Sequence, residues 1–137
     1  MSQPDILDSP PSYVLDASAL LALLHRERGL EVVQASVAVS VISSVNWAEV
    51  IQKVIARSGR EPTEVVDELE YLGLVVIPFT ADDAEMAAGL WNLGRRIGLS
   101  LGDRACLSLA RRFDLPALTG DRRWATLDLG AEVRLIR

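Results

Sequence analysis

The chain has 137 residues, half of them hydrophobic, and a formal net charge of −5 at pH 7. This length suits one domain with a single core, and no apolar run approaches the roughly 18 residues that a membrane span requires. The single cysteine, Cys106, excludes an internal disulfide and a four-cysteine zinc site. The chain also has a single histidine, His25. The acidic balance disfavours a simple nucleic-acid-binding module, which needs a basic face.

The first predicted elements follow a polar start. Residues 1–11, MSQPDILDSPP, lack the basic-then-apolar layout of a signal peptide, so we expect a flexible tail, a domain over 12–137 and a cytoplasmic location. SYVLD (12–16) predicts a buried strand that ends at Asp16. Ser18 is expected to cap a helix that runs to about Glu27. A helix over about 30–37 and a strand over about 39–42 should follow.

The middle of the chain predicts two helices, a strand and a further helix. In 46–59, apolar residues from Trp47 recur with the period of an amphipathic helix, and Gly59 should end it. A second helix is expected within 61–73 and a strand at 74–79. Thr80 then resembles an N-cap, with Asp83 three residues on as a near capping box, for a helix that reaches about Arg96.

The last part of the chain repeats this alternation. Ser100 or Gly102 should start the helix DRACLSLARRF, LPALT (115–119) reads as a strand, DRRWATL as a short turn or helix, and 132–136 as a final strand. Short apolar strands that alternate with helices predict an α/β sandwich around a parallel sheet.

Four acids in this pattern are expected to meet. Asp16 and Asp121 follow the carboxyl ends of strands, where open α/β sheets bind ligands. Asp103, in the first turn of its helix, heads an apolar stripe. Glu49 is expected in the first turn of the tryptophan helix, away from its apolar stripe. Each also has an ordinary interpretation. Asp16 could cap the following helix, and Glu49 could be a solvated helix residue. Asp103 could be a favourable charge at a helix N-terminus, and Asp121 could be a turn aspartate.

If the four carboxylates do meet, they must either be protonated or bind a cation. Two like charges about 4 Å apart repel by about 4 kcal/mol at an effective dielectric near 20, and several such pairs rival the stability of a whole domain. The predicted ligands are all oxygens, which favours Mg²⁺ or Mn²⁺ over zinc. Such an ion activates water for in-line phosphoryl displacement and lets an acidic protein hold a polyanion.

The motifs VLDASALLALL, NWAEV, LSLGDRACLSLA and LTGDRRW resemble the PIN domain, and more narrowly the VapC-type toxin of bacterial toxin–antitoxin pairs, over about residues 12–137. The resemblance implies a three-layer α/β/α sandwich with a central, mainly parallel sheet and metal-dependent endoribonuclease activity. It implies that Asp16, Glu49, Asp103 and Asp121 form the catalytic and metal-binding quartet, with Asp16 and Asp103 as the most direct ligands.

The resemblance also implies supporting groups and partners. Ser18 and Thr119 match hydroxyl positions that orient the acids or a water, and Arg104, Arg122 and Arg123 are candidates for RNA contact or surface ion pairs. The expected products carry a 5′-phosphate and a 3′-hydroxyl. The expected partners are an RNA substrate, a VapB-type antitoxin whose tail covers the acidic pocket, and a second copy of the chain in a homodimer, with no membrane.

Two other functions compete with this hypothesis. A PIN-like protein could bind RNA or a partner without cutting it. A phosphoryl-transfer hydrolase of the haloacid dehalogenase type is suggested by an aspartate after the first strand, but the expected second acid is missing at 17–19, and Lys53 is the only lysine.

Overall fold

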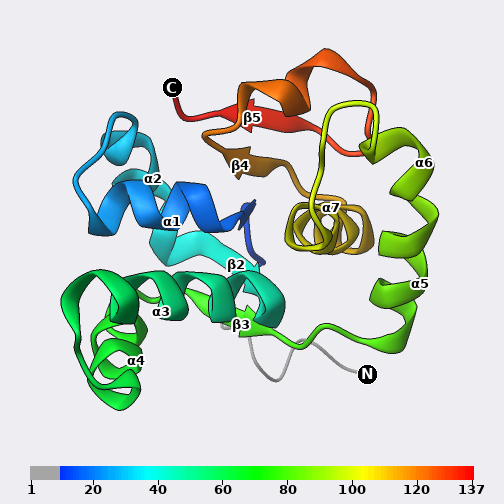
Figure 1. Ribbon diagram of the computed structural model, residues 1–137. Helices are drawn as coiled ribbons and strands as arrows, with labels where there is room; N and C mark the ends of the chain where they lie inside the picture. The colour runs from blue at the N-terminus through cyan, green and yellow to red at the C-terminus, as the bar shows by residue number, and fades with distance from the viewer. Residues whose placement is uncertain (1–9) are drawn as a thin grey trace.

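The computed structural model describes residues 10–137 and places a parallel sheet between two groups of helices (Figure 1). Within these residues the sheet has five strands in the order β3-β2-β1-β4-β5, and every neighbouring pair is parallel. The predicted α/β sandwich is therefore confirmed. The strands are β1 (Tyr13–Leu15), β2 (Ser40–Ser43), β3 (Val75–Ile77), β4 (Ala117–Thr119) and β5 (Val133–Leu135).

The helices of the first half of the chain cover one face of the sheet. Their buried side chains form one core cluster with Leu15, Ile42 and Leu118 of the strands. Figure 1 shows these helices grouped on one side of the sheet. They are α1 (Ala17–Leu24), α2 (Leu30–Ser36), α3 (Ser44–Ser58) and α4 (Pro62–Glu70), with the short 3-10 helix η2 (Val37–Val39) after α2.

The later helices cover the opposite face. A second core cluster forms there around α7, and it includes Val14 and Val41 of the strands, Leu107 of α7 and the fully buried Trp124. Trp124 is therefore a core residue, because its side chain is not exposed to solvent. The elements of this side are α5 (Ala81–Gly89), α6 (Trp91–Gly94), α7 (Leu101–Phe113) and the 3-10 helix η3 (Arg122–Thr126).

Three sequence predictions need correction. Ser18 does not cap α1, because the Asp16 carboxylate takes that position and accepts from the Ala19 amide. The helix α3 begins at Ser44, capped by the Ser43 hydroxyl, so Glu49 lies in its second turn and not in its first. The single helix expected up to Arg96 is divided at Leu90, whose ψ of −1° departs from helical geometry.

The two central strands place the candidate site. The connection from β1 leads outward to β2 and β3, whereas β4 returns to the other side of β1. The order therefore reverses between β1 and β4, and ligands of open α/β sheets bind outside the carboxyl ends of the strands at such a point. Asp16 follows β1, and Asp121 lies two residues beyond β4.

Two further observations complete the fold. None of the helices found in residues 10–137 is long and apolar enough to span a bilayer. Of the tail expected at 1–11, residues 1–9 lie outside the described residues, and the proposed boundary of the domain stays a prediction.

Candidate active site

Asp16 is the most buried acid of the predicted quartet, with an exposed fraction of 3%. Its Oδ1 accepts from the Ser18 hydroxyl at 2.7 Å and from the Ala19 amide at 2.8 Å, and its Oδ2 accepts from the Thr119 hydroxyl at 2.7 Å. Burial nevertheless raises the pKa of Asp16 to about 6, and the charge of Asp103 adds to the rise. The site thus stabilises the carboxylate by hydrogen bonds while leaving it short of positive charge.

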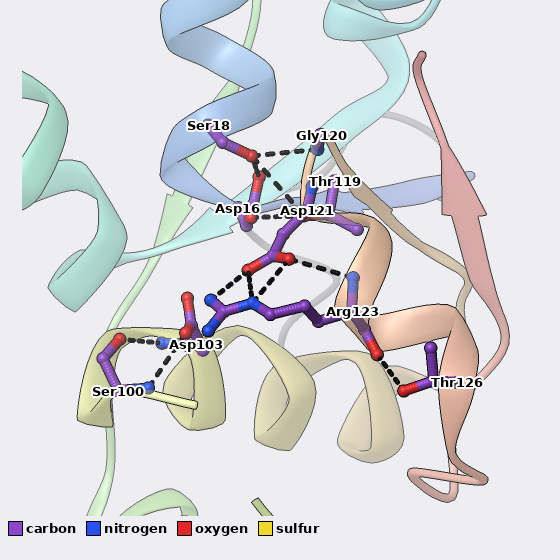
Figure 2. Close-up of polar contacts among 9 residues, drawn as sticks. All are labelled: Asp16, Ser18, Ser100, Asp103, Thr119, Gly120, Asp121, Arg123 and Thr126. Atoms are coloured by element: carbon purple, nitrogen blue, oxygen red, sulfur yellow. Dashed lines mark hydrogen bonds and ion pairs between the residues drawn. The ribbon is translucent and has the colours of Figure 1, made fainter. Parts of the chain in front are cut away.

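Ser18 and Thr119 connect Asp16 to the loop after β4. The Ser18 hydroxyl, which donates to Asp16, accepts from the Gly120 amide at 2.9 Å. The Thr119 hydroxyl, which also donates to Asp16, accepts from the Asp121 amide at 3.0 Å. These two hydroxyls therefore fix the ends of β1 and β4 relative to each other, as Figure 2 shows.

Asp121 forms an ion pair with a residue of its own turn. The Arg123 guanidinium donates to both carboxylate oxygens, through Nε to Oδ1 at 3.0 Å and through Nη2 to Oδ2, and the Arg123 amide also donates to Oδ1. The hydrogen bonds from Arg123 lower the pKa of Asp121, and they raise the pKa of Arg123 in turn. Asp121 is thus neutralised within the chain, unlike Asp16.

Asp103 lies across from this ion pair at the start of α7. Its Oδ2 accepts from the Ser100 amide at 2.9 Å, and its own amide donates to the Ser100 hydroxyl at 3.1 Å, which completes a capping box. In Figure 2 the Arg123 guanidinium lies between Asp121 and Asp103, and the Asp103 charge contributes to the raised pKa of Arg123. The capping box uses one carboxylate oxygen of Asp103.

Glu49 reaches the site from α3. Its Oε1 accepts from the Asn46 Nδ2 at 2.9 Å, and the same Nδ2 donates to the carbonyl oxygen of Gly102 at 2.9 Å. The carboxylate lies directly against Gly102, because a Cβ at that position would be 2.6 Å from both carboxylate oxygens. Glu49 is therefore held beside the first turn of α7, the helix that carries Asp103.

Cys106 is a core thiol on which the charges of three of the acids act. This thiol is fully buried, and burial is the main cause of its raised pKa. The charges of Asp16, Asp103 and Glu49 raise it further, in that order. Cys106 is therefore a small buried side chain of the core. Asp121 is joined to Asp16 through the Thr119 hydroxyl, and Glu49 lies against Gly102, the residue before Asp103.

The predicted arginines are not equivalent. Arg123 alone among them bonds an acid of the quartet. The Arg104 Nη1 donates to the carbonyl oxygen of Ala87 on α5 at 2.8 Å, so this side chain ties α7 to α5. The Arg122 Nη1 donates to the carbonyl oxygen of Arg137 at 2.9 Å. RNA contact by these residues stays a prediction.

The donor set fits a small hard cation held partly by water. In residues 10–137, no group of three or more His, Cys, Asp or Glu side chains is arranged so that it could hold a metal ion by itself. Mg²⁺ commonly binds through one or two carboxylates and keeps several waters. Asp16 supplies a buried carboxylate that lacks a cationic partner. The Oδ1 of Asn46 is a buried oxygen without a hydrogen-bond donor among the described residues. These oxygens suit Mg²⁺ or Mn²⁺ better than zinc.

Sequence reasoning missed three features of this site. Ser100 and Asp103 have the same spacing as Thr80 and Asp83, so a second capping box was available from the pattern. Asn46 lies three residues before Glu49 on the same helix, a spacing that brings side chains together. The role of Gly102 had no local signal, because it depends on a contact between α3 and α7.

Comparison with known proteins identifies the family of the fold. The family model described as PIN domain matches residues 13–129. Comparison with curated proteins gives no match.

Solved structures with the same fold include three toxin–antitoxin or VapBC structures. A toxin–antitoxin complex from Klebsiella pneumoniae contains a chain with 22% identity and a TM-score of 0.70, covering 92% of this chain and 98% of that one. DNA-bound VapBC from Salmonella typhimurium gives 17% identity and a TM-score of 0.71, covering 93% and 99%. VapBC-1 from nontypeable Haemophilus influenzae gives 16% identity and a TM-score of 0.67, covering 90% of this chain and 97% of that one. At these identities the likeness establishes the fold.

Proposed function

The chain belongs to the PIN domain family, and from this premise we propose that it is a Mg²⁺-dependent endoribonuclease, with Mn²⁺ as a substitute, that acts in the cytoplasm as the toxin of a toxin–antitoxin pair. The observation that carries the proposal is Asp16. A carboxylate with 3% exposure, at the point where the strand order reverses, has three hydrogen-bond donors and, among residues 10–137, no cationic side chain bonded to it. Such a group destabilises the fold when ionised, so we expect it to serve chemistry.

The residues of the site divide the work. Asp16 would bind the cation most directly, and the hydroxyls of Ser18 and Thr119 would keep its two oxygens in place. Asp103 has one carboxylate oxygen outside its capping box for the same cation or for the proton of the attacking water. When bound, a divalent cation supplies charge neutralisation at the scissile phosphate and lowers the pKa of water.

Arg123 would bind the phosphate through its guanidinium. Its guanidinium bonds Asp121 in this structure, and a planar guanidinium also matches a phosphate through two hydrogen bonds. We propose that RNA competes with Asp121 for Arg123. This exchange would bring a positive charge to the developing negative charge of the transition state.

The proposed protein partner is a small VapB-type antitoxin, and the proposed assembly is a homodimer. Several neighbours with this fold are VapBC structures, which supports the partner. An antitoxin arginine that entered the acidic pocket would have to compete with Arg123 for Asp121. Release of RNA cleavage on removal of a co-purified small protein tests the partner, and sedimentation equilibrium of the isolated chain tests the dimer.

The cleavage experiment uses purified chain freed of any antitoxin, incubated with total cellular RNA in Mg²⁺, in Mn²⁺ or in EDTA. We expect discrete fragments with 5′-phosphate and 3′-hydroxyl ends in either metal and none in EDTA. Asp16→Asn should lower the cleavage rate by at least about 10²-fold, because it removes the charge of the most direct ligand. Asp67→Asn, which removes an exposed acid from α4, is the matched control and should cleave normally.

Absence of metal-dependent cleavage, from protein shown to be folded and antitoxin-free, would contradict the proposal. It would favour the alternative, a PIN-like protein that binds RNA or a partner without cutting. One observation favours that alternative. The ion pair with Arg123 already neutralises Asp121, one acid of the quartet.

A further inference from the structure

Asn46 of α3 contacts Gly102 of α7 through a hydrogen bond beside the acid site. Asn46 lies in the first turn of α3 and is 1% exposed. Gly102 lies in the first turn of α7, on the other side of the sheet edge. The carboxylate of Glu49 lies between them.

The orientation of the Asn46 amide is determined by its partners. Both atoms near it, the Glu49 Oε1 and the Gly102 carbonyl oxygen, are acceptors, each 2.9 Å from the same nitrogen. Only the NH₂ group can serve two acceptors, because each of its hydrogens donates to one of them. The opposite orientation would place an oxygen against both, so the amide has one compatible arrangement.

Gly102 leaves room for the Glu49 carboxylate, whereas its backbone conformation does not call for glycine. It lies within α7, and its φ is outside the range that favours glycine. Glycine is a poorer helix former than alanine, so a glycine here needs another reason. A Cβ at this position would be 2.6 Å from both Glu49 oxygens and 2.7 Å from the carboxyl carbon. The Glu49 carboxylate occupies the space that a side chain at position 102 would fill.

We propose that Asn46 and Gly102 are positioning residues that clamp the Glu49 carboxylate in the acid site. Asn46 fixes one oxygen of Glu49 through its amide. Gly102 lets that carboxylate lie against α7, close to Asp103 and to the positive end of the helix dipole. The clamp gives Glu49 one location although its side chain has three rotatable bonds. This assignment rests on the proposed function for its catalytic meaning, but the contact itself is testable without activity.

The first test measures stability and needs no metal. Gly102→Ala should destabilise the full chain to urea when Glu49 is present, because the new Cβ displaces the Glu49 carboxylate and breaks its hydrogen bond from Asn46. In an Glu49→Ala background the same substitution should be neutral or stabilising, because the space is empty and alanine favours the helix. Equal effects of Gly102→Ala in the two backgrounds would overturn the clamp whatever the protein cleaves.

The second test measures Mn²⁺ binding by calorimetry and cleavage of total RNA in parallel. Asn46→Leu keeps the branched shape and the number of side-chain heavy atoms and removes both hydrogen bonds, and we expect its Kd for Mn²⁺ to rise about 10-fold or more, the range seen when partners of metal ligands are lost. In an Glu49→Gln background, Asn46→Leu should have little further effect. Additive losses in the double variant would show that Asn46 does not act through Glu49.

The outcomes separate this inference from the proposed function. If the wild-type chain neither binds Mn²⁺ nor cleaves RNA, the proposed function fails, and the urea experiment alone decides the clamp. If the wild-type chain cleaves RNA but the Asn46 and Glu49 losses add, the function stands and the positioning role is overturned. A variant that loses its fold is recognised by the same urea curves, and Asn46→Gln then replaces Asn46→Leu as a polar variant with a displaced amide.

Discussion

The two aspartates that follow the central strands have opposite electrostatic environments, although both occupy the same kind of joint. Asp16 is buried among neutral donors, and burial raises its pKa from 3.8 to about 6. Asp121 is bonded by Arg123, which lowers its pKa. The difference arises from one arginine two residues after Asp121, whereas the equivalent position after Asp16 is the neutral Ser18. The two residues should therefore affect stability in opposite directions as pH changes.

For Asp16, we expect the Asp16→Asn variant to gain stability relative to wild type as pH rises. Between pH 3.8 and about 6 the folded state binds more protons than the unfolded state, so ionisation of Asp16 lowers the free energy of unfolding. A pKa change of this size corresponds to about 3 kcal/mol at most. Urea unfolding in EDTA at several values between pH 4 and pH 7.5 measures the difference. A difference that stays constant with pH would refute the account of Asp16.

Asp121→Asn is the matched comparison and should show the opposite sign. Because the folded pKa of Asp121 is lowered, the ion pair with Arg123 stabilises the wild-type fold above the unfolded pKa of 3.8. That contribution is lost as pH falls through the folded pKa. The wild-type advantage over Asp121→Asn should thus shrink on acidification below about pH 4, measured in the same urea series.

At the scale of elements, two helices on the same side of the sheet begin with the same motif but different surroundings. Thr80 and Asp83 cap α5, and Ser100 and Asp103 cap α7. Asp83 is buried and pairs with Arg112 of α7 at 3.5 Å, which makes its capping box part of the packing between α5 and α7. The box of α7 is instead exposed at the acid site.

We expect Thr80→Ala and Ser100→Ala to lower the free energy of unfolding by similar amounts, about 0.5–2 kcal/mol, because each removes one side-chain cap. Only Ser100→Ala should also lower RNA cleavage, because Asp103 depends on the first turn of α7 for its location. Urea unfolding and cleavage rates of the two variants provide the comparison. Equal cleavage by both variants would mean that the α7 box is structural only.

The helix limits show which part of the fold a sequence determines. Apolar runs and period-3.6 patterns locate the strands and most helices, because each element must bury one face. The cap of α1 was misplaced, because Ser18 and Asp16 are both good N-cap residues and the choice depends on Thr119, which is distant in sequence. The break at Leu90 is marked only by Gly89, and a single glycine inside a helical pattern is often tolerated, so the sequence alone did not place it.

At the scale of the molecule, the candidate site joins the two halves of the sandwich. Asp16 follows the central strand, Glu49 comes from the helices of one face, and Asp103 comes from those of the other (Figure 1). The sequence predicted this meeting from the strand ends and from the family resemblance. It could not predict the contact of Asn46 with Gly102 or the arginine between Asp121 and Asp103, since both depend on tertiary packing.

This placement makes the bound cation a test of the whole fold. The acids are spread from residue 16 to residue 121, so the unfolded chain has no equivalent site, and a cation that binds only the folded state must stabilise it. At a Mn²⁺ concentration about 100 times its Kd, the gain is about 2.7 kcal/mol. For a domain of this size we expect the Tm to rise by roughly 5–15 °C over its value in EDTA.

Two variants decide whether that rise comes from the acid site or from general neutralisation of an acidic protein. Asp16→Asn and Asp67→Asn each remove one negative charge from a chain of net charge −5. Asp67 is exposed on α4, on the outside of the sandwich, so its variant should keep the full Mn²⁺-dependent rise in Tm. Asp16→Asn should lose most of it, because the buried carboxylate without a cationic partner is the group that the metal relieves. Equal rises in the two variants would assign the effect to diffuse surface charge and would remove the main physical support for a metal at Asp16.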